Sequence, residues 1–498
     1  MSGPPRLSAR EILALVLDVP GSPGAAGASG SREPSSSSGA SGSREPSSSS
    51  GASGSREPSS SPGAPGVSGV SGSFDELPCT ARASAPDGPL AWPGYDASRA
   101  RATERTGETE SVVCGVGVVE GTRAVLIAFE FGFLGGSLGE RTGDRLEAAH
   151  RHARDHRLPV VSLVATGGSR MQEGMVALTQ LQRVARQSAL TRQAGLAQIA
   201  VLRDPTTGGG WATLGAGADV VLALPGAQVG FAGARVRPPD ADPAAYTAEA
   251  QVAAGAADAV VEPGTLRETL GRWLRLLTRP SREPAPVPRA LGAQDLPATG
   301  WDAVRRARSP RRPRADAYLD AYFGLRAAIG GDRCGGTDPD GMRCGFGEHR
   351  GRTVAYAAQT GTATRPAGYR TATRLIRLAD RLGIPVLTLV DTPGAANDAE
   401  AERQGAGAAI AELFGAVATA RTPVTTLVIG EGGSGGALAL AAPGRTWATP
   451  DSYFSVIAPE AAAAILKRPP GEVEATAGQL RIRPKDLAEL GVVRTDLP

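Results

Sequence analysis

Two glycine-rich stretches contain the residues whose types and spacing best suit chemistry. Residues 200–217 read AVLRDPTTGGGWATLGAG, and residues 424–442 read VTTLVIGEGGSGGALALAA. In each, an apolar run precedes the glycines and a run of small residues follows, which predicts a buried strand, a tight turn and a helix. Glycine lets the backbone approach a ligand closely and leaves amide N–H groups free at the start of the helix. Such amides can stabilise an oxyanion.

Two serines offer an alternative chemistry. Ser137 and Ser434 each lie in a G-x-S-x-G pattern, which is the spacing of the nucleophile elbow in α/β-hydrolases. Hydrolases of that class have their histidine after the nucleophile. All four histidines precede Ser434, and those at positions 150, 152 and 156 fall on the helix predicted directly after Ser137. The sequence therefore disfavours a serine hydrolase, although a glycine turn without any ligand stays open as an alternative.

The elements that must position the glycines occur twice. Before the first stretch comes an apolar strand ending in a turn, LPVVSLVATGG at residues 158–168, and before the second comes IPVLTLVDTPG at residues 384–394. A helical pattern separates strand from glycines in both places, and the spacing is nearly equal. We therefore predict one α/β unit used twice. Two equivalent turns suggest two oxyanion-stabilising sites.

Length, composition and charge limit the class of protein. The chain has 498 residues, 41% hydrophobic and 21% charged, enough for a large core and two or three domains. A net charge of +3 gives no reason to expect nucleic acid. The four cysteines form no C-x-x-C pair, which predicts a reducing cytoplasm and no bound metal. No apolar run is long enough for a membrane helix, so we expect a cytoplasmic, soluble protein.

Composition also predicts the domain limits. Residues 1–72 hold a short segment and then a GASGSREPSSSS repeat near residues 27–62, which lacks the apolar surface to fold and should be disordered. A first domain is predicted at 73–280 and a second at 301–498. The Pro-rich stretch at 281–300 is the linker between them.

Several side chains outside the glycine turns have two interpretations. Arg170 precedes a predicted helix and could reach a phosphate or carboxylate, or be salt-bridged. Met171 and Met175 are one helical turn apart and are predicted to be core. The arginine cluster in residues 301–323 could be a solvated helix face or could attract a multiply phosphorylated ligand. No G-x-x-x-x-G-K-[ST] stretch is present, which excludes P-loop chemistry.

The motifs resemble the carboxyltransferase of bacterial acetyl-CoA carboxylase. The first half resembles the β subunit through FEFGFLGGSLG (129–139), TGGSRMQEG (166–174), DPTTGGGWATLGAGADV (204–220) and GFAGARV (230–236). The second half resembles the α subunit through RSPRRPRADAYL (308–319), GYRTATRLIRLADRLGIPVLTLVDTPGA (368–395), IGEGGSGGALAL (429–440) and YFSVIAPEAAAAIL (453–466). The order in one chain is that of the fused acyl-CoA carboxylase subunits.

The resemblance implies an α/β fold and a reaction. Each half would be a crotonase-like β-β-α superhelical domain. The enzyme would move a carboxyl group from carboxybiotin to acetyl-CoA and so produce malonyl-CoA. Both the ureido group and the thioester enolate carry negative charge on a carbonyl oxygen, so backbone amides are the main catalytic requirement. Gly208 and Gly209 match the family's pair for one oxyanion, and Gly435 and Gly436 match the pair for the other.

The resemblance also implies a substrate site and partners. Gly135, Gly136, Gly167, Gly168 and Arg170 would line the acyl-CoA side. The family's active site lies between the β-type half of one protomer and the α-type half of another, which implies a homo-oligomer, a dimer or a hexamer. The chain has no lysine in a biotin-attachment context, so no cofactor is bound covalently. Biotin carboxylase and a biotin carboxyl carrier protein would be separate partners.

The sequence departs from the family in ways that leave alternatives. The β subunit's four-cysteine zinc ribbon is missing, so no zinc is predicted. The basic loop that precedes GYR in the α subunit is shortened to TGTATRPA, residues 360–367. Propionyl-CoA or a longer acyl-CoA is the alternative substrate. A non-catalytic crotonase-like scaffold that binds acyl-CoA is the alternative of another class.

Overall fold

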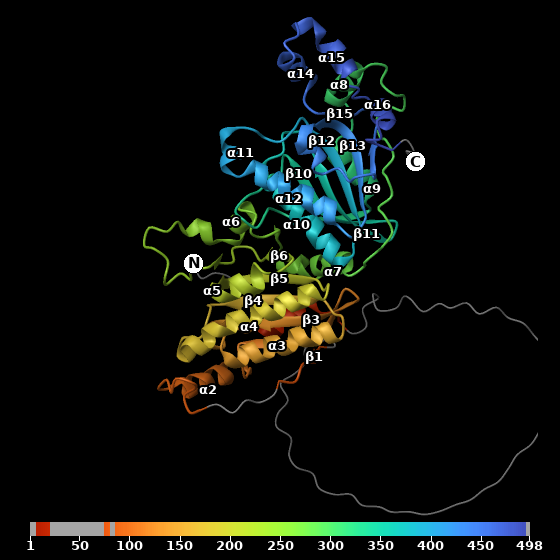
Figure 1. Cartoon of the computed structure of the whole chain (residues 1–498). Coiled ribbons are helices and arrows are strands. Elements are labelled where there is room, and N and C mark those ends of the chain that lie inside the picture. Colours follow the sequence, from red (N-terminus) through yellow and green to blue (C-terminus); the bar gives the residue numbers. More distant parts are fainter. Residues whose placement is uncertain (1–5, 20–73, 80–84, 495–498) are drawn as a thin grey trace, which may run out of the picture.

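The structure, a computed structural model, describes residues 6–19, 74–79 and 85–494. The predicted disorder of residues 27–62 lies outside the described residues. Each half of the chain forms one β-sheet with helices packed on it, and the two halves lie end to end (Figure 1). Among the described residues, no helix is long and apolar enough to cross a membrane.

The first sheet has eight strands in the order β1-β2-β3-β4-β5-β6-β8, with β7 paired to β5. The pairs β1–β2 and β2–β3 are antiparallel, whereas β3, β4, β5, β6 and β8 run parallel. The strands are β1 (Asp75–Glu76), β2 (Val112–Val119), β3 (Thr122–Phe129), β4 (Val160–Thr166), β5 (Gln198–Thr207), β6 (Val220–Ala223), β7 (Val229–Gly230) and β8 (Ala259–Val260).

Helices cover both faces of this sheet. On one face α3 packs beside α4, and on the other α1 and α7 pack together against β3 (Figure 1). The helices of this half are α1 (Ala9–Val16), α2 (Tyr95–Thr106), α3 (Glu140–Asp155), α4 (Gly174–Gln193), α5 (Gly208–Gly210), α6 (Ala248–Ala253) and α7 (Leu266–Leu277). Ile12, Leu13 and Val16 of α1 are buried, so this helix belongs to the first half by packing although it precedes residue 73.

The second sheet repeats this topology with seven strands in the order β14-β13-β12-β11-β10-β9, and β15 pairs with β13. The pairs β9–β10 and β10–β11 are antiparallel, whereas β11 to β14 are parallel. The strands are β9 (Leu325–Ala328), β10 (Met342–His349), β11 (Arg352–Gln359), β12 (Val386–Thr392), β13 (Val424–Gly433), β14 (Thr446–Ala448) and β15 (Tyr453–Ser455).

Helices α10 and α12 pack together beside the second sheet, and α10 separates it from the first half (Figure 1). The helices of this half are α8 (Gly300–Arg308), α9 (Ala315–Tyr322), α10 (Pro366–Leu382), α11 (Ala399–Arg403), α12 (Ala406–Thr419), α13 (Ser434–Leu438), α14 (Pro459–Ile465), α15 (Val473–Gln479) and α16 (Pro484–Glu489). Proline at the first helical position of α10 and Gly383 in the left-handed conformation after it fix the ends of this helix.

The halves are joined by a shared core and by buried charge. One continuous apolar cluster contains Trp273 of α7 and Phe346 of β10, whose rings lie 6.3 Å apart. Asp258, fully buried just before β8, pairs with Arg374 of the second half at 3.0 Å and also with Arg333. Burial alone would raise the pKa of Asp258, but these two guanidinium groups hold the pKa below its usual range. The junction is therefore a packed interface.

Candidate active site

The first glycine turn is located where β5 ends. Gly208 has a φ of +62°, a conformation that glycine adopts without strain, and it starts the short helix α5. Its amide donates a hydrogen bond to the carbonyl of Phe231 at 3.0 Å. Gly209 and Gly210 are buried, and among the described residues no acceptor is found for their amides. Buried amides without a partner are rare in folded proteins, so this pair is available for a ligand.

The second glycine turn is located where β13 ends. Ser434 begins α13 with a φ of +58°, which is unusual for a residue other than glycine. The carbonyl of Gly436 accepts hydrogen bonds from Gln359 at 3.1 Å and from the hydroxyl of Tyr369 at 3.2 Å. Within the described part of the chain, the amides of Gly435 and Gly436 have no acceptor. The turn is thus anchored through its carbonyl with two amides left over.

The two turns are equivalent in the repeated unit. In each half, a seven-residue strand is followed by a ten-residue strand, and the register of the pair shifts just before the turn. After the shift, Thr166 pairs with Thr206 in the first half, and Thr392 pairs with Gly432 in the second. This confirms the internal repeat that the sequence predicts.

The register shows which glycines of the two turns are equivalent. Counting on from the strand pairs, Gly208 is equivalent to Ser434, whereas Gly209 and Gly210 are equivalent to Gly435 and Gly436. The amide of Gly208 is already bonded to Phe231, so the free pair in the first half is Gly209 and Gly210. The catalytic role of Gly208 stays a prediction, and Gly210, which the sequence pattern did not single out, is the second residue with a free amide. The three consecutive glycines gave no signal of which two are free.

Close packing explains why three of these positions are glycine. A Cβ added at Gly210 would lie 2.3 Å from Thr166 Cγ2, and one added at Gly436 would lie 2.5 Å from the amide nitrogen of Ala395. At Gly209 it would lie 2.2 Å from the side chain of Leu181. At Gly435 nothing lies within 4 Å of such an atom. The Cβ side of Gly435 therefore faces open space.

The structure brings the predicted substrate-side glycines together. The amide of Gly167 donates to the carbonyl of Gly135 at 2.9 Å, so the turn after β4 is bonded to the turn after β3. Gly168, with a φ of +108°, lies against Gly208: a Cβ added at Gly208 would be 3.1 Å from its Cα. Gly136 is held against β4, because a Cβ there would meet the carbonyl oxygen of Ala165. These turns form one backbone surface beside Gly208, the residue before Gly209.

The sequence comparisons decide which family has this arrangement. A family model described as carboxyl transferase domain matches residues 93–269, and one described as acetyl co-enzyme A carboxylase carboxyltransferase-like matches residues 295–496. The chain is 39% identical over 80% of its length to the acetyl-coenzyme A carboxylase carboxyl transferase subunits beta/alpha of Saccharopolyspora erythraea, covering 73% of that protein. The chain belongs to this carboxyltransferase family.

Further relatives carry the same names or a broader one. The subunits beta/alpha of Salinispora arenicola are 39% identical, with 86% of this chain and 80% of that protein covered. A probable biotin-dependent acyl-coenzyme A carboxylase beta3 subunit of Mycobacterium bovis is 35% identical, with 82% and 85% covered. The family resemblance predicted from the sequence motifs is confirmed.

Solved structures show the same fold at lower identity. Transcarboxylase 12S, a hexamer, matches with a TM-score of 0.67 at 21% identity, with 84% of this chain and 83% of that chain covered. A single-chain, multi-domain long-chain acyl-CoA carboxylase matches with a TM-score of 0.65 at 20% identity, covering 86% of this chain and 44% of that one. These likenesses confirm the predicted α/β fold with two crotonase-like halves.

Arg170 is salt-bridged within the fold, as one of its two interpretations had it, and its contact with substrate stays a prediction. Its side chain is 1% exposed and pairs with Glu110 and, at 3.3 Å, with Glu173. It also donates to the carbonyl of Ser137 at 2.8 Å. Burial alone would raise the pKa of Glu110, but the Arg170 guanidinium holds the pKa below its usual range. Arg170 therefore supports the turn after β3 from inside.

The arginine cluster near α8 is likewise mostly paired within the chain. Arg312 is buried and contacts Asp391 at 2.6 Å, and Arg308 contacts Glu431 at 2.9 Å. Burial raises the pKa of Asp391, and the nearby Arg312 lowers it only in part. Asp391 Oδ1 also accepts the amide of Glu431 at 3.1 Å, next to the second glycine turn. These arginines brace β13 and are not a solvated face.

Exposed apolar side chains adjoin both glycine turns. Met171, which lies in a short 3-10 helix before α4, and Met175, which lies in the first turn of α4, were predicted to be core but are 76% and 67% exposed. Phe231, whose carbonyl holds Gly208, is 74% exposed, and Val456 after β15 is also 74% exposed. The two methionines do not share one continuous helix, because Gly174 between them has a φ of +51°. The sequence does not show which neighbour covers these side chains. Each turn is thus next to an apolar surface.

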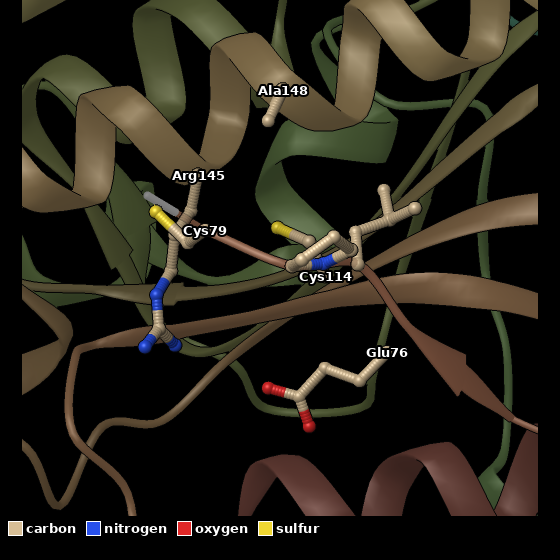
Figure 2. Close-up of a pocket in the computed structure, with 7 residues that line it drawn as sticks. Glu76, Cys79, Cys114, Arg145 and Ala148 are labelled. Atoms are coloured by element: carbon tan, nitrogen blue, oxygen red, sulfur yellow. The ribbon is translucent and has the colours of Figure 1, made fainter. Parts of the chain in front are cut away.

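Ser137, Cys79 and Cys114 lie outside the two glycine turns, whereas Ser434 begins the second one. Ser137 is buried and accepts a hydrogen bond from Arg170, and His150 is bonded to Thr191 instead of a serine. Cys79 and Cys114 line a pocket of about 280 Å³ beside β1, with Arg145 close to Cys79 and Glu76 pointing away (Figure 2). No group of three potential metal ligands is found among the described residues. The expected lack of zinc stays a prediction.

Proposed function

We propose that this chain transfers the carboxyl group of carboxybiotin, presented on a carrier protein, to acetyl-CoA and so produces malonyl-CoA. The observation that carries the proposal is the equivalent pair of free amides in each half, at Gly209 and Gly210 and at Gly435 and Gly436. Carboxyl transfer places negative charge on two carbonyl oxygens, one of the ureido ring and one of the thioester. Each amide aimed at such an oxygen lowers the barrier by about 3 kcal/mol.

The chain's own groups would bind and orient the substrates and would exclude water from the site. The surface formed by Gly135, Gly167 and Gly168 supplies a side-chain-free wall beside Gly209 for the acyl-CoA thioester. The second turn would hold the ureido oxygen. Neither turn has a histidine or lysine among its contacts, which fits a reaction whose proton acceptor is the biotin ring itself. No covalently bound cofactor is required of this chain.

We propose that the working enzyme is a homo-oligomer in which one copy covers the apolar surface of another. Met171, Met175 and Phe231 in the first half and Val456 and Ile465 in the second are exposed by two thirds or more. Exposed apolar surface of this kind marks an interaction site. Its position beside both glycine turns supports an active site shared between the β-type half of one copy and the α-type half of the next. The proposed location is the cytoplasm.

A reconstituted assay tests the proposal. The protein is mixed with a biotin carboxylase, a biotinylated carrier protein, ATP, bicarbonate and acetyl-CoA, and malonyl-CoA is measured. The proposal predicts carrier-dependent malonyl-CoA. Parallel reactions with propionyl-CoA and a long-chain acyl-CoA decide the substrate, because some relatives are named for acyl-CoA. No product from any acyl-CoA, with the fold intact, would favour the non-catalytic scaffold.

A further inference from the structure

A groove at the junction of the two halves lies at the opposite end of the sheets from the glycine turns. Its walls include Pro159, Ala197 and Pro423, which directly precede β4, β5 and β13. The glycine turns follow the last residues of β5 and β13. The groove encloses about 950 Å³, within the size range of small-molecule sites. It is therefore separate from the proposed active site.

Charge in this junction groove is strongly unbalanced. Five arginines and a single acidic residue, Asp380, line it; the arginines are Arg123, Arg157, Arg282, Arg381 and Arg421. Arg381 pairs with Asp219 at 2.6 Å, and Arg421 pairs with Asp380 at 3.2 Å. For the other three, no carboxylate partner is found among the described residues. Unpaired cations gathered around one hollow favour an anionic ligand.

The arginines come from both halves and from the linker between them. Arg123 lies on β3, Arg282 lies in the linker after α7, and Arg421 lies just before β13. Arg157 is held in place because its guanidinium donates to the carbonyl of Ala194 at 2.5 Å. Arginine binds phosphate oxygens with two parallel hydrogen bonds. A ligand with several phosphates could contact more than one wall at once.

The groove also has an apolar part. Leu158, Leu196, Leu277 and Leu382 line it and are almost fully buried, so their edges form its floor. An inorganic polyphosphate would leave this floor uncovered, because it has no apolar part. A ligand that joins phosphates to a ring matches both parts.

We propose that the junction groove binds a nucleoside di- or triphosphate, with its phosphates held by Arg123 and Arg282 and its base on the leucine floor. Because both halves line the groove, the ligand bridges them. This site is independent of carboxyl transfer at the glycine turns.

Calorimetric titration of the full chain tests this site. ATP, ADP, AMP and inorganic tripolyphosphate are titrated separately, each with and without saturating acetyl-CoA. The proposal predicts one nucleotide per chain, binding of ATP and ADP that acetyl-CoA does not displace, and weaker binding of tripolyphosphate. Arg123→Glu combined with Arg282→Glu should weaken ATP binding by at least about tenfold. The matched control is Arg289→Glu with Arg311→Glu, two exposed arginines outside the groove, which should bind ATP as before.

Each opposite result overturns the proposal. Displacement of ATP by acetyl-CoA would place the nucleotide in the CoA site. Tripolyphosphate binding as tightly as ATP would show attraction by charge alone. If the control variant bound ATP as weakly as the groove variant, or if no nucleotide bound at all, the groove would not be a nucleotide site. Circular dichroism of both double variants shows whether the fold is retained.

Discussion

A backbone amide differs from other catalytic groups because substituting the side chain does not remove it. The sequence determines only whether the fold supplies a hydrogen-bond acceptor for that amide. In the first half, Phe231 takes the amide of Gly208, and the next two stay free. In the second half, serine replaces glycine at the equivalent left-handed position, at Ser434. Only the hydrogen-bond pattern distinguishes a glycine whose amide is used by the fold from one whose amide is free.

A buried histidine gives the folded protein a measurable response to pH. Burial, together with the nearby charge of Arg154, lowers the pKa of His150 to about 4. An unfolded histidine has a pKa of about 6.5. Between about pH 6.5 and about pH 4, this histidine is therefore protonated in the unfolded chain and neutral in the folded protein. The free energy of unfolding should therefore fall as the pH drops from about 6.5 to about 4, by up to about 3 kcal/mol.

Replacing this histidine should remove that part of the pH dependence. His150→Asn keeps a polar group near Thr191, which His150 contacts at 3.1 Å, but cannot titrate. Denaturant unfolding at several pH values should show a flatter dependence for the variant than for the wild type. His156→Asn, at an exposed position, is the control and should keep the wild-type dependence. Equal pH dependence in both variants would contradict the assignment.

At the scale of elements, the sequence predicts more of the strands than of the helix faces. The runs at 158–168 and 384–394 are apolar throughout because both faces of a central parallel strand are covered, and both became strands. Helix α4 was also predicted, but Met171 and Met175 proved exposed. Periodicity shows that a helix has an apolar face; it does not show whether the same chain or another copy covers it.

The exposed face of α4 supplies a test of assembly. Met171→Asp combined with Met175→Asp should dissociate the oligomer, because two carboxylates would be buried without partners in the interface. Light scattering after gel filtration would measure the mass. Leu291→Asp, at an exposed leucine of the linker, is the control and should leave the mass unchanged. A double variant with the wild-type mass and activity would contradict the proposed interface.

At the scale of the molecule, the junction depends on contacts that the sequence does not reveal. Asp258 is an ordinary acid in the sequence, yet it is fully buried and joins Arg333 and Arg374 across the halves. The pairing spans two domains, so no local pattern records it. The internal repeat, by contrast, was visible because both copies keep the same strand lengths before their glycines.

Neutralising Asp258 should lower the free energy of unfolding of the whole molecule. Asp258→Asn leaves two largely buried guanidinium groups without their counter-charge, and breaking such a pair costs about 3–5 kcal/mol. Denaturant unfolding should show a loss of that order. Asp240→Asn, at an exposed acid, should change the free energy of unfolding little. A stability equal to that of the wild type would mean that the apolar core alone holds the halves together.

The most direct test of the central claim removes one free amide N–H. Gly435→Pro deletes the N–H in the first turn of α13, where proline is tolerated and nothing lies within 4 Å of an added Cβ. Gly435→Ala adds a Cβ but keeps the N–H. With thermal melting confirming both folds, we predict that the proline variant loses about 10²–10³ in kcat for malonyl-CoA formation while the alanine variant stays near wild type. Equal kcat in the two variants would contradict the role of this amide.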